Sequence, residues 1–392
     1  MRRTATRRAL ILKSNPRGLV LGYHENRMNA IAVSRRPGAV TAAPWLGGLR
    51  WDATWLIGSA AIVPLVLVFV WAGVPNAWLN LAVTTIVGGP HLFATYTATY
   101  MDPRFRRTHA PLLILVSILV PAGVTLMTLY DFQALLSFFI FAASIHVLQQ
   151  NAYLADVYRR RGARPERPWA RWVDYGFVGL SFYPIASYKL VNGAFRLGET
   201  EILIPPLFRT EATYWAVSLA FAALAALWVW KTLEERRRGV LNLPKTVLIG
   251  VTAGIAFTVP LCGDGGRLEL AFQAVNAWHS IQYLGLVWFI QQIRHQRGLI
   301  EPSFARTLSA PRRSAGRYFG FCFATSVTLL GAMVYLSYVN PFGLDTSVAF
   351  DRYYYMGILS CLLIHYALDA YLFMAASFTG ANAEKVPYAA FG

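Results

Sequence analysis

A chain of 392 residues in which 56% are hydrophobic and only 14% are charged is too apolar for an ordinary soluble domain, where about 25% of residues are charged. The formal net charge of +17 would favour nucleic-acid binding in a soluble protein, but here the basic residues lie in short segments between apolar runs. The composition therefore indicates a membrane protein with many crossings and no nucleic-acid partner. Its three cysteines stand alone, without CxxC spacing, and predict neither a disulfide nor a thiolate metal site.

The N-terminal segment is strongly basic, and Glu25 is its only acidic residue. Its apolar pieces are too short for the core of a signal peptide, so residues 1–50 are expected to be a disordered cytoplasmic tail. Met28 opens a second plausible N-terminus. Residues 51–378 are expected to form a transmembrane helix bundle, and residues 379–392 a short cytoplasmic C-terminal tail.

Ten apolar runs follow the basic segment, and each is close to the length of about 20 residues that an α-helix needs to span a bilayer. Helices are the default because lipid offers backbone polar groups no other partner. The sequence thus predicts an all-α, polytopic integral membrane bundle of about ten transmembrane helices. The runs are 54–73, 78–100, 112–130, 132–158, 172–192, 213–232, 243–262, 270–292, 317–339 and 353–376.

Basic residues in the loops alternate between the two predicted sides. With a cytoplasmic N-terminus, Arg and Lys gather in the inside segments, such as 159–171 and 231–245, and are scarce in the outside ones. The positive-inside rule then predicts a multi-pass protein of the cell's inner (plasma) membrane with both termini in the cytoplasm. The longest outside segment, 193–212, is expected to form a short ordered cap.

Four histidines fall on the second, fourth, eighth and tenth predicted helices, all of which run from outside to inside: His91, His146, His279 and His365. They lie between about 9 and 14 residues from the outer helix ends, hence within roughly 8 Å of one another in depth at about 1.5 Å per residue. A single membrane histidine is more often a hydrogen-bonding link between helices. Four at one depth instead predict a metal or metal-cofactor site near the bilayer midplane.

One helical turn after each of these histidines, the sequence places a polar residue on the same helix face. These residues are Thr95, Gln150, Tyr283 and Asp369, and Gln149 and Gln282 add polar groups three residues after a histidine. Metal-bound imidazoles need an acceptor for their second ring nitrogen, and these side chains could provide it. Asp369 is the strongest indication, because a carboxylate inside a span is costly and should face a partner.

Neutral imidazoles without thiolates suit iron, copper or zinc. Zinc with four histidines would be a closed structural site, and membrane haems usually use histidine pairs at two depths. A di-iron desaturase would need about eight histidines in clusters that this chain lacks. A mononuclear Fe²⁺ site is therefore favoured, while haem and copper stay open.

Four segments carry a resemblance to a known family: GGPHLFATY with His91, SIHVLQQNAYLAD with His146, NAWHSIQYLG with His279 and IHYALDAY with His365. They resemble the bacterial membrane β-carotene dioxygenase family (Brp/Blh-like). The resemblance covers only these segments. It implies an all-helical membrane protein that holds iron through histidines from several spans and uses O₂ to cleave a polyene.

The predicted function is that of a membrane non-haem iron oxygenase. Iron held by the four histidines would use O₂ to oxidise a lipophilic, polyene or lipid-like substrate that enters from membrane lipid. Asp369 and Gln150 would orient the ligand imidazoles, and Tyr283 would donate a proton or a hydrogen bond to oxygen. Two alternatives remain open: a transporter or proton-coupled carrier with a buried His, Asp and Gln path, and a haem-binding membrane electron carrier.

Overall fold

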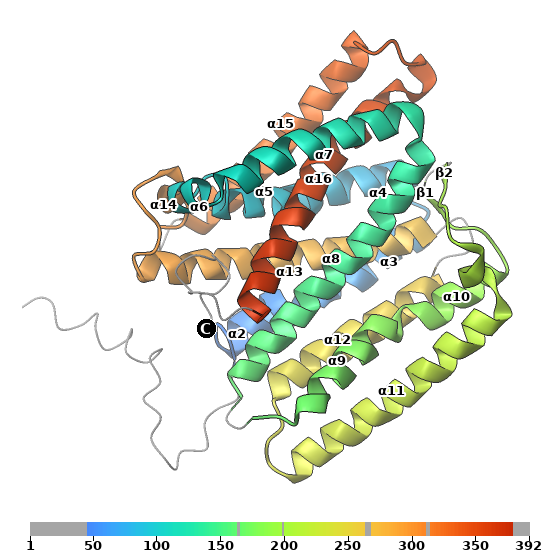
Figure 1. The fold of residues 1–392 in the computed structure, drawn as a ribbon, viewed down its shortest axis with the longest axis vertical. Helices are drawn as coiled ribbons and strands as arrows, with labels where there is room; N and C mark the ends of the chain where they lie inside the picture. The colour runs from blue at the N-terminus through green and yellow to red at the C-terminus, as the bar shows by residue number, and fades with distance from the viewer. Residues whose placement is uncertain (1–44, 163–164, 198–199, 263–267, 311–313, 379–392) are drawn as a thin grey trace, which may run out of the picture. The chain divides into compact units, whose positions relative to one another are not determined.

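The computed structural model describes residues 45–378 apart from 163–164, 198–199, 263–267 and 311–313 (Figure 1). The predicted N-terminal tail up to residue 44 and the predicted C-terminal tail, 379–392, lie outside the described residues. Within the described part, helices account for nearly all regular structure, and the strands form one short antiparallel hairpin. The prediction of an all-α fold is confirmed.

The first half of the described chain runs from a short irregular helix into long regular ones (Figure 1). Its elements are α2 (Leu49–Trp51), η1 (Asp52–Ile57), η2 (Gly58–Ala61), α3 (Ile62–Trp71), α4 (Asn76–Val83), η3 (Thr84–Gly88), α5 (Gly89–Ala98), α6 (Pro103–Thr108), α7 (Ala110–Tyr130) and α8 (Phe132–Arg160). Helices α4, η3 and α5 follow one another without a break in helical backbone, so this predicted crossing is one helix with a π-helical turn in its middle.

The second half contains the small hairpin and six further helices of more than ten residues. Its elements are α9 (Pro168–Ser181), α10 (Tyr183–Val191), β1 (Arg196–Leu197), β2 (Thr200–Glu201), η4 (Pro206–Arg209), α11 (Glu211–Arg237), α12 (Leu243–Thr258), η5 (Val259–Cys262), α13 (Leu268–Gln296), α14 (Phe304–Leu308), α15 (Ser314–Val339) and α16 (Thr346–Phe378). The hairpin and η4 lie in the predicted cap, where Leu197 and Ile202 are buried.

Seven helices in the described residues are long and apolar enough to cross a membrane, so the predicted count of ten is not confirmed. They are Leu49–Trp71, Ala110–Tyr130, Phe132–Arg160, Glu211–Arg237, Leu243–Leu261, Ala315–Val339 and Thr346–Phe373. Run 172–192 differs because it is two helices, α9 and α10, which meet just before Pro184, a residue without a backbone N–H for a continuous helix. Runs 78–100 and 270–292 are helical, but their histidines, glutamines, asparagines and threonines lower the mean hydropathy.

Helix α8 lies between two groups of helices (Figure 1). On one side, α16 packs against α5, α7, α8 and α15, and α13 packs against α3 and α5. On the other side, α9 packs against α11 and α12, and α12 also contacts α8. The first group together with α8 carries all four histidines of interest, and the second carries most of a network of charged side chains.

Residues just before the predicted bundle also belong to it. The Asp52 carboxylate, which is fully buried, accepts hydrogen bonds from the backbone N–H of Leu46 at 2.7 Å and of Gly47 at 2.9 Å. It also accepts one from the hydroxyl of Tyr158 at 2.8 Å. Since Leu46 is 5% exposed, the packed part of the chain begins before residue 51.

Candidate metal centre

Four histidine side chains from four different helices form one closed cluster: His91 on α5, His146 on α8, His279 on α13 and His365 on α16. Each is at most 3% exposed. Ring centroids lie 5.3 Å apart for His91 and His279, 4.9 Å for His279 and His146, 4.7 Å for His146 and His365, and 4.8 Å for His365 and His91. The rings thus follow one another in a cycle, each beside two others, as expected from their common depth.

The backbone of α5 is adapted around His91. The π-helical turn Thr84–Gly88 ends immediately before α5, and Pro90 then supplies no backbone N–H to the helix. Gly89 is required by packing against α15, because a Cβ at this position would lie 1.7 Å from the hydroxyl oxygen of Ser326. The local sequence Gly88-Gly89-Pro90 therefore brings α5 unusually close to its neighbour at the level of the histidines.

The orientation of the His91 ring fixes which of its nitrogens faces the cluster. Its Nδ1–H donates to the carbonyl of Gly88, which can only accept, and the Ser280 hydroxyl lies 3.1 Å from the same nitrogen. In a neutral imidazole the other nitrogen, Nε2, then carries the lone pair. This Nε2 is buried and has no hydrogen-bond partner among the described residues.

His365 is held in the same way, through a hydroxyl that is itself held by a carboxylate. Its Nδ1 lies 2.7 Å from the Thr95 hydroxyl, which in turn donates to Asp369 at 3.1 Å. The Tyr283 hydroxyl donates to the same carboxylate oxygen at 2.7 Å and also contacts Thr95. Thr95, Tyr283 and Asp369 are completely buried. The Thr95 hydroxyl donates its proton to Asp369, so it must accept from His365 Nδ1–H. In the neutral ring of His365, Nε2 then carries the lone pair.

His146 and His279 differ from the other two rings, because neither nitrogen of either has a hydrogen-bond partner in the described part of the chain. His146 is positioned instead by the ring of Tyr366, which stacks on it at 4.3 Å between centroids and 21° between planes. A buried imidazole that makes no hydrogen bond is costly. The cluster therefore has ring nitrogens available for another partner.

The spacing of the rings suits a single central ion. With metal–nitrogen bonds of about 2.1 Å and ring centroids about 1.1 Å further out, neighbouring imidazoles on one ion have centroids about 4.5 Å apart in a square and about 5.2 Å apart in a tetrahedron. The observed separations run from 4.7 to 5.3 Å. Donor atoms of His91, His279 and His365 lie within 4.8 Å of one another, as do those of His146, His365 and Asp369. The cluster therefore offers two overlapping groups of three donors that could hold a metal ion, and His365 belongs to both groups.

Six polar residues are predicted to accompany the histidines. Three of them lie beside the ring of His365, and the other three lie elsewhere. Thr95, Tyr283 and Asp369 converge on His365 rather than serving one histidine each. The Gln150 amide donates to the Gln282 side-chain oxygen at 2.6 Å, and Gln282 donates to the carbonyl of Leu56 at 2.6 Å, so this pair links helices. Gln150 therefore does not orient His146 as predicted. Gln149 lines a cavity between α8, α9 and α12.

Sequence reasoning missed three residues that position the rings: Gly88, Ser280 and Tyr366. Ser280 and Tyr366 each directly follow one of the clustered histidines. Partners on the same helix face are expected only three or four positions later, so this expectation does not include them. Of the other histidines, His109 contacts the Tyr371 hydroxyl and His295 contacts Ser309, both away from the cluster.

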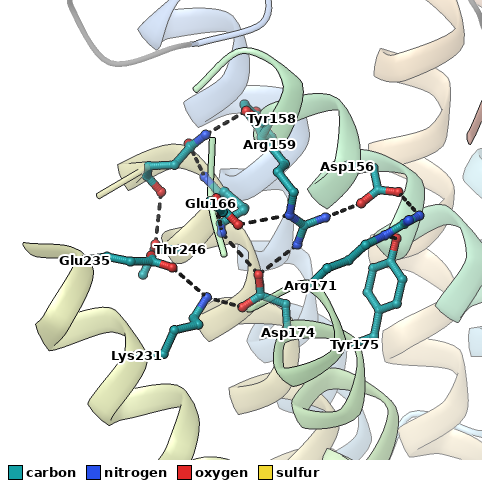
Figure 2. A network of polar contacts seen from close by, with 12 residues as sticks. Asp156, Tyr158, Arg159, Glu166, Arg171, Asp174, Tyr175, Lys231, Glu235 and Thr246 are labelled. Carbon is teal, nitrogen blue, oxygen red and sulfur yellow. Dashed lines mark hydrogen bonds and ion pairs between the residues drawn. The ribbon is translucent and has the colours of Figure 1, made fainter. Parts of the chain in front are cut away.

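A second buried polar region joins the C-terminal end of α8 to α9, α11 and α12 (Figure 2). Asp174 is at its centre: its carboxylate accepts from Arg159 at 2.9 Å, from Lys245 at 3.1 Å and from Lys231. The network contains four acids and four bases, namely Asp156, Glu166, Asp174, Glu235, Arg159, Arg171, Lys231 and Lys245, and each makes at least one ion pair. Its charges compensate one another, and among the described residues its side chains form no group that could hold a metal.

Comparison with known proteins finds no protein-family model, no curated protein and no solved structure that matches this chain. The resemblance to the β-carotene dioxygenase family therefore stays a prediction, and the functional argument depends on the chain's own residues.

Proposed function

We propose that this chain is an integral membrane metal-dependent oxidoreductase, a non-haem iron oxygenase whose iron is bound by His91, His146, His279 and His365. The observation that carries the proposal is the closed cycle of four buried imidazoles with unpartnered ring nitrogens. We further propose that the protein lies in the cell's inner membrane with about ten crossings and both termini in the cytoplasm, as its loop charges predict.

Ring spacing favours a single ion over haem. Two histidines on opposite sides of a haem iron have centroids about 6.4 Å apart, from bonds of about 2.1 Å and a further 1.1 Å to each centroid. Adjacent rings here are at most 5.3 Å apart, and for either opposite pair the other two rings would occupy the space of the porphyrin. Iron is preferred over zinc because four histidines leave iron further coordination positions, whereas they close a tetrahedral zinc site.

Bound iron would supply redox chemistry with O₂, and the residues around it would supply position and protons. The Gly88 carbonyl and the Thr95 hydroxyl hold the Nδ1–H groups of His91 and His365, so that Nε2 of both rings faces the centre. The Tyr283 hydroxyl, hydrogen-bonded to Asp369, is the nearest candidate proton donor. Burial of the whole cluster suits an apolar substrate, of polyene or lipid type, delivered from the membrane.

Metal analysis of the purified protein tests the proposal. We expect one iron per chain in the unaltered protein and loss of that iron in His146→Ala and in His365→Ala. His295→Ala is the matched control, because it removes a histidine outside the cluster, where burial and the nearby Arg306 lower the pKa of the ring. Substoichiometric metal in the unaltered protein would contradict the proposal. One copper per chain instead of one iron would show that the site binds copper and that iron is the wrong metal.

A second candidate function is supported by the hydrogen-bonded series Asp369, Thr95 and His365, with Tyr283 on the same carboxylate. Such a series inside a bundle is typical of proton-coupled carriers. A carrier would acidify or alkalinise the lumen of proteoliposomes when its substrate moves, and its activity would persist after metal is removed by a chelator. An oxygenase would consume O₂ only in the metal-loaded state.

A further inference from the structure

A cavity of 270 Å³ lies between α8, α9 and α12, and it is separate from the histidine cluster. Its walls are mainly apolar, with contributions from Leu148, Ala152, Ala155, Val178, Leu248 and Ile249. At about 100° per residue, Leu148, Ala152 and Ala155 lie about 180° to 240° around α8 from His146. Most of the cavity wall on α8 therefore lies away from His146, and Gln149, about 60° around the helix from His146, lies at the edge of the cavity.

The Gln149 side chain, which is partly exposed, lines this cavity and makes no hydrogen bond with any group in the described part of the chain. Gln149 lies near the middle of α8, far from lipid headgroups at either helix end. Two further polar residues in the wall are already engaged: Thr252 donates to Asn151 at 3.2 Å, and Asn151 donates to the carbonyl of Val147 at 2.9 Å. An amide in apolar surroundings without a partner is unfavourable, so Gln149 indicates an occupant with a hydrogen-bonding group.

The charged side chains near the cavity are already paired, which favours an uncharged occupant. Asp174 also lines the cavity, but its carboxylate is shared by Arg159, Lys231 and Lys245 (Figure 2). The surrounding network balances four acids against four bases, all of them in ion pairs. A charged headgroup would find no uncompensated partner here and would lose its own hydration.

We propose that this cavity binds an uncharged lipophilic molecule with a single hydroxyl or carbonyl group, which hydrogen-bonds to the amide of Gln149. The volume of 270 Å³ corresponds to about nine groups of the size of water at ~30 Å³ each. The occupant, or the part of it that enters, is therefore an aliphatic or ring segment of about that many heavy atoms. This site goes beyond the proposed metal function and does not depend on it.

Three matched probes test the proposal on the full-length protein in detergent: 1-octanol, octane and octyl phosphate. Each has the same chain length, and they differ only in the group offered to Gln149. Binding is measured by the concentration dependence of the thermal unfolding midpoint. We expect 1-octanol to bind about three- to tenfold more tightly than octane, which is the range that one net hydrogen bond produces, and octyl phosphate to bind more weakly than 1-octanol.

Two variants locate the binding. Gln149→Leu should reduce the affinity for 1-octanol to that for octane, and Ala152→Phe should abolish saturable binding of both by filling the cavity. Ala223→Phe, on the exposed face of α11, is the matched control and should bind as the unaltered protein does. Equal binding of octane and 1-octanol, preference for octyl phosphate, or full binding by Ala152→Phe would each overturn the proposal. Iron content should be the same in all of these variants, which separates this test from that of the metal site.

Discussion

Two buried polar regions share α8 and differ in how their polar atoms are used. Around Asp174, at the C-terminal end of the helix, every charged side chain of the network is paired, and each carboxylate faces at least one Lys or Arg. Around His146, near the middle of the helix, each clustered imidazole has at least one buried ring nitrogen without a hydrogen-bond partner among the described residues. The first arrangement pairs its charges within the protein, whereas the second leaves buried ring nitrogens unpartnered among the described residues, as the proposed metal site would need.

This difference indicates what each region contributes. A compensated ionic network ties the ends of α8, α9, α11 and α12 together and stabilises the bundle, although a buried network of this kind is often no better than well-packed apolar residues. Four close buried imidazoles, each with at least one ring nitrogen that has no hydrogen-bond partner among the described residues, are costly by themselves, because their desolvation is not fully offset. Their convergence from four helices, distant in sequence, is the observation that supports the proposed ion.

The largest expected effect comes from breaking the network at its centre. Asp174→Asn should lower the free energy of unfolding by about 3–5 kcal/mol, because it leaves buried Lys231 and Lys245 without their shared carboxylate. His146→Leu in metal-free protein should cause no such loss, because His146 makes no hydrogen bond in the described residues. Denaturation in detergent micelles measures both.

Asp345→Asn is the control for this pair of variants. Asp345 is a fully exposed carboxylate that contacts only Ser347 among the described residues, and its substitution should leave the denaturation midpoint unchanged. If His146→Leu destabilised the metal-free protein as much as Asp174→Asn, the contrast between the two regions would be lost.

The second expected effect concerns the hydroxyl that links His365 to Asp369. Thr95→Val keeps the shape of the side chain but removes the acceptor for His365 Nδ1 and the donor to Asp369. Loss of such a partner of a metal-bound histidine typically weakens metal binding 10- to 100-fold. A competition titration against a chelator of known affinity measures this change.

Thr95→Ser is the matched variant, since it keeps the hydroxyl and should bind metal nearly as tightly as the unaltered protein. Equal affinity in the Val and Ser variants would show that the hydroxyl has no part in holding His365.

Helices and the depth of the histidines could be predicted from the sequence because both follow from local spacing. Apolar length fixes where a helix can cross lipid, and a rise of about 1.5 Å per residue fixes the depth of each histidine along it. Three of the ten predicted crossings are not among the seven helices of the described residues that are long and apolar enough to cross a membrane. In α5 and α13, the polar residues around the histidine cluster lower the mean hydropathy, and a helix is recognised as a membrane crossing by its mean hydropathy.

The partners of each ring could not be predicted, because they depend on how the helices rotate against one another. A same-face rule assigns Thr95 to His91, yet its hydroxyl bonds to His365, 270 residues away in sequence. Likewise Gln150 bonds to Gln282 rather than to His146. Sequence spacing identifies which residues share a helix face, and only packing decides which neighbouring helix that face meets.

The smallest expected effect tests whether stacking compensates for the missing hydrogen bonds of His146. Tyr366→Leu removes the ring that lies parallel to His146 at 4.3 Å, and an aromatic pair of this kind contributes about 0.5–1.5 kcal/mol. Metal affinity should therefore fall by between about two- and twelvefold, because His146 would be held less firmly. Tyr366→Phe keeps the ring and should bind metal as the unaltered protein does. If the Leu variant bound metal as tightly as the unaltered protein, stacking on Tyr366 would have no part in positioning His146. Its ring would then be held only by the backbone of α8 and by the metal ion.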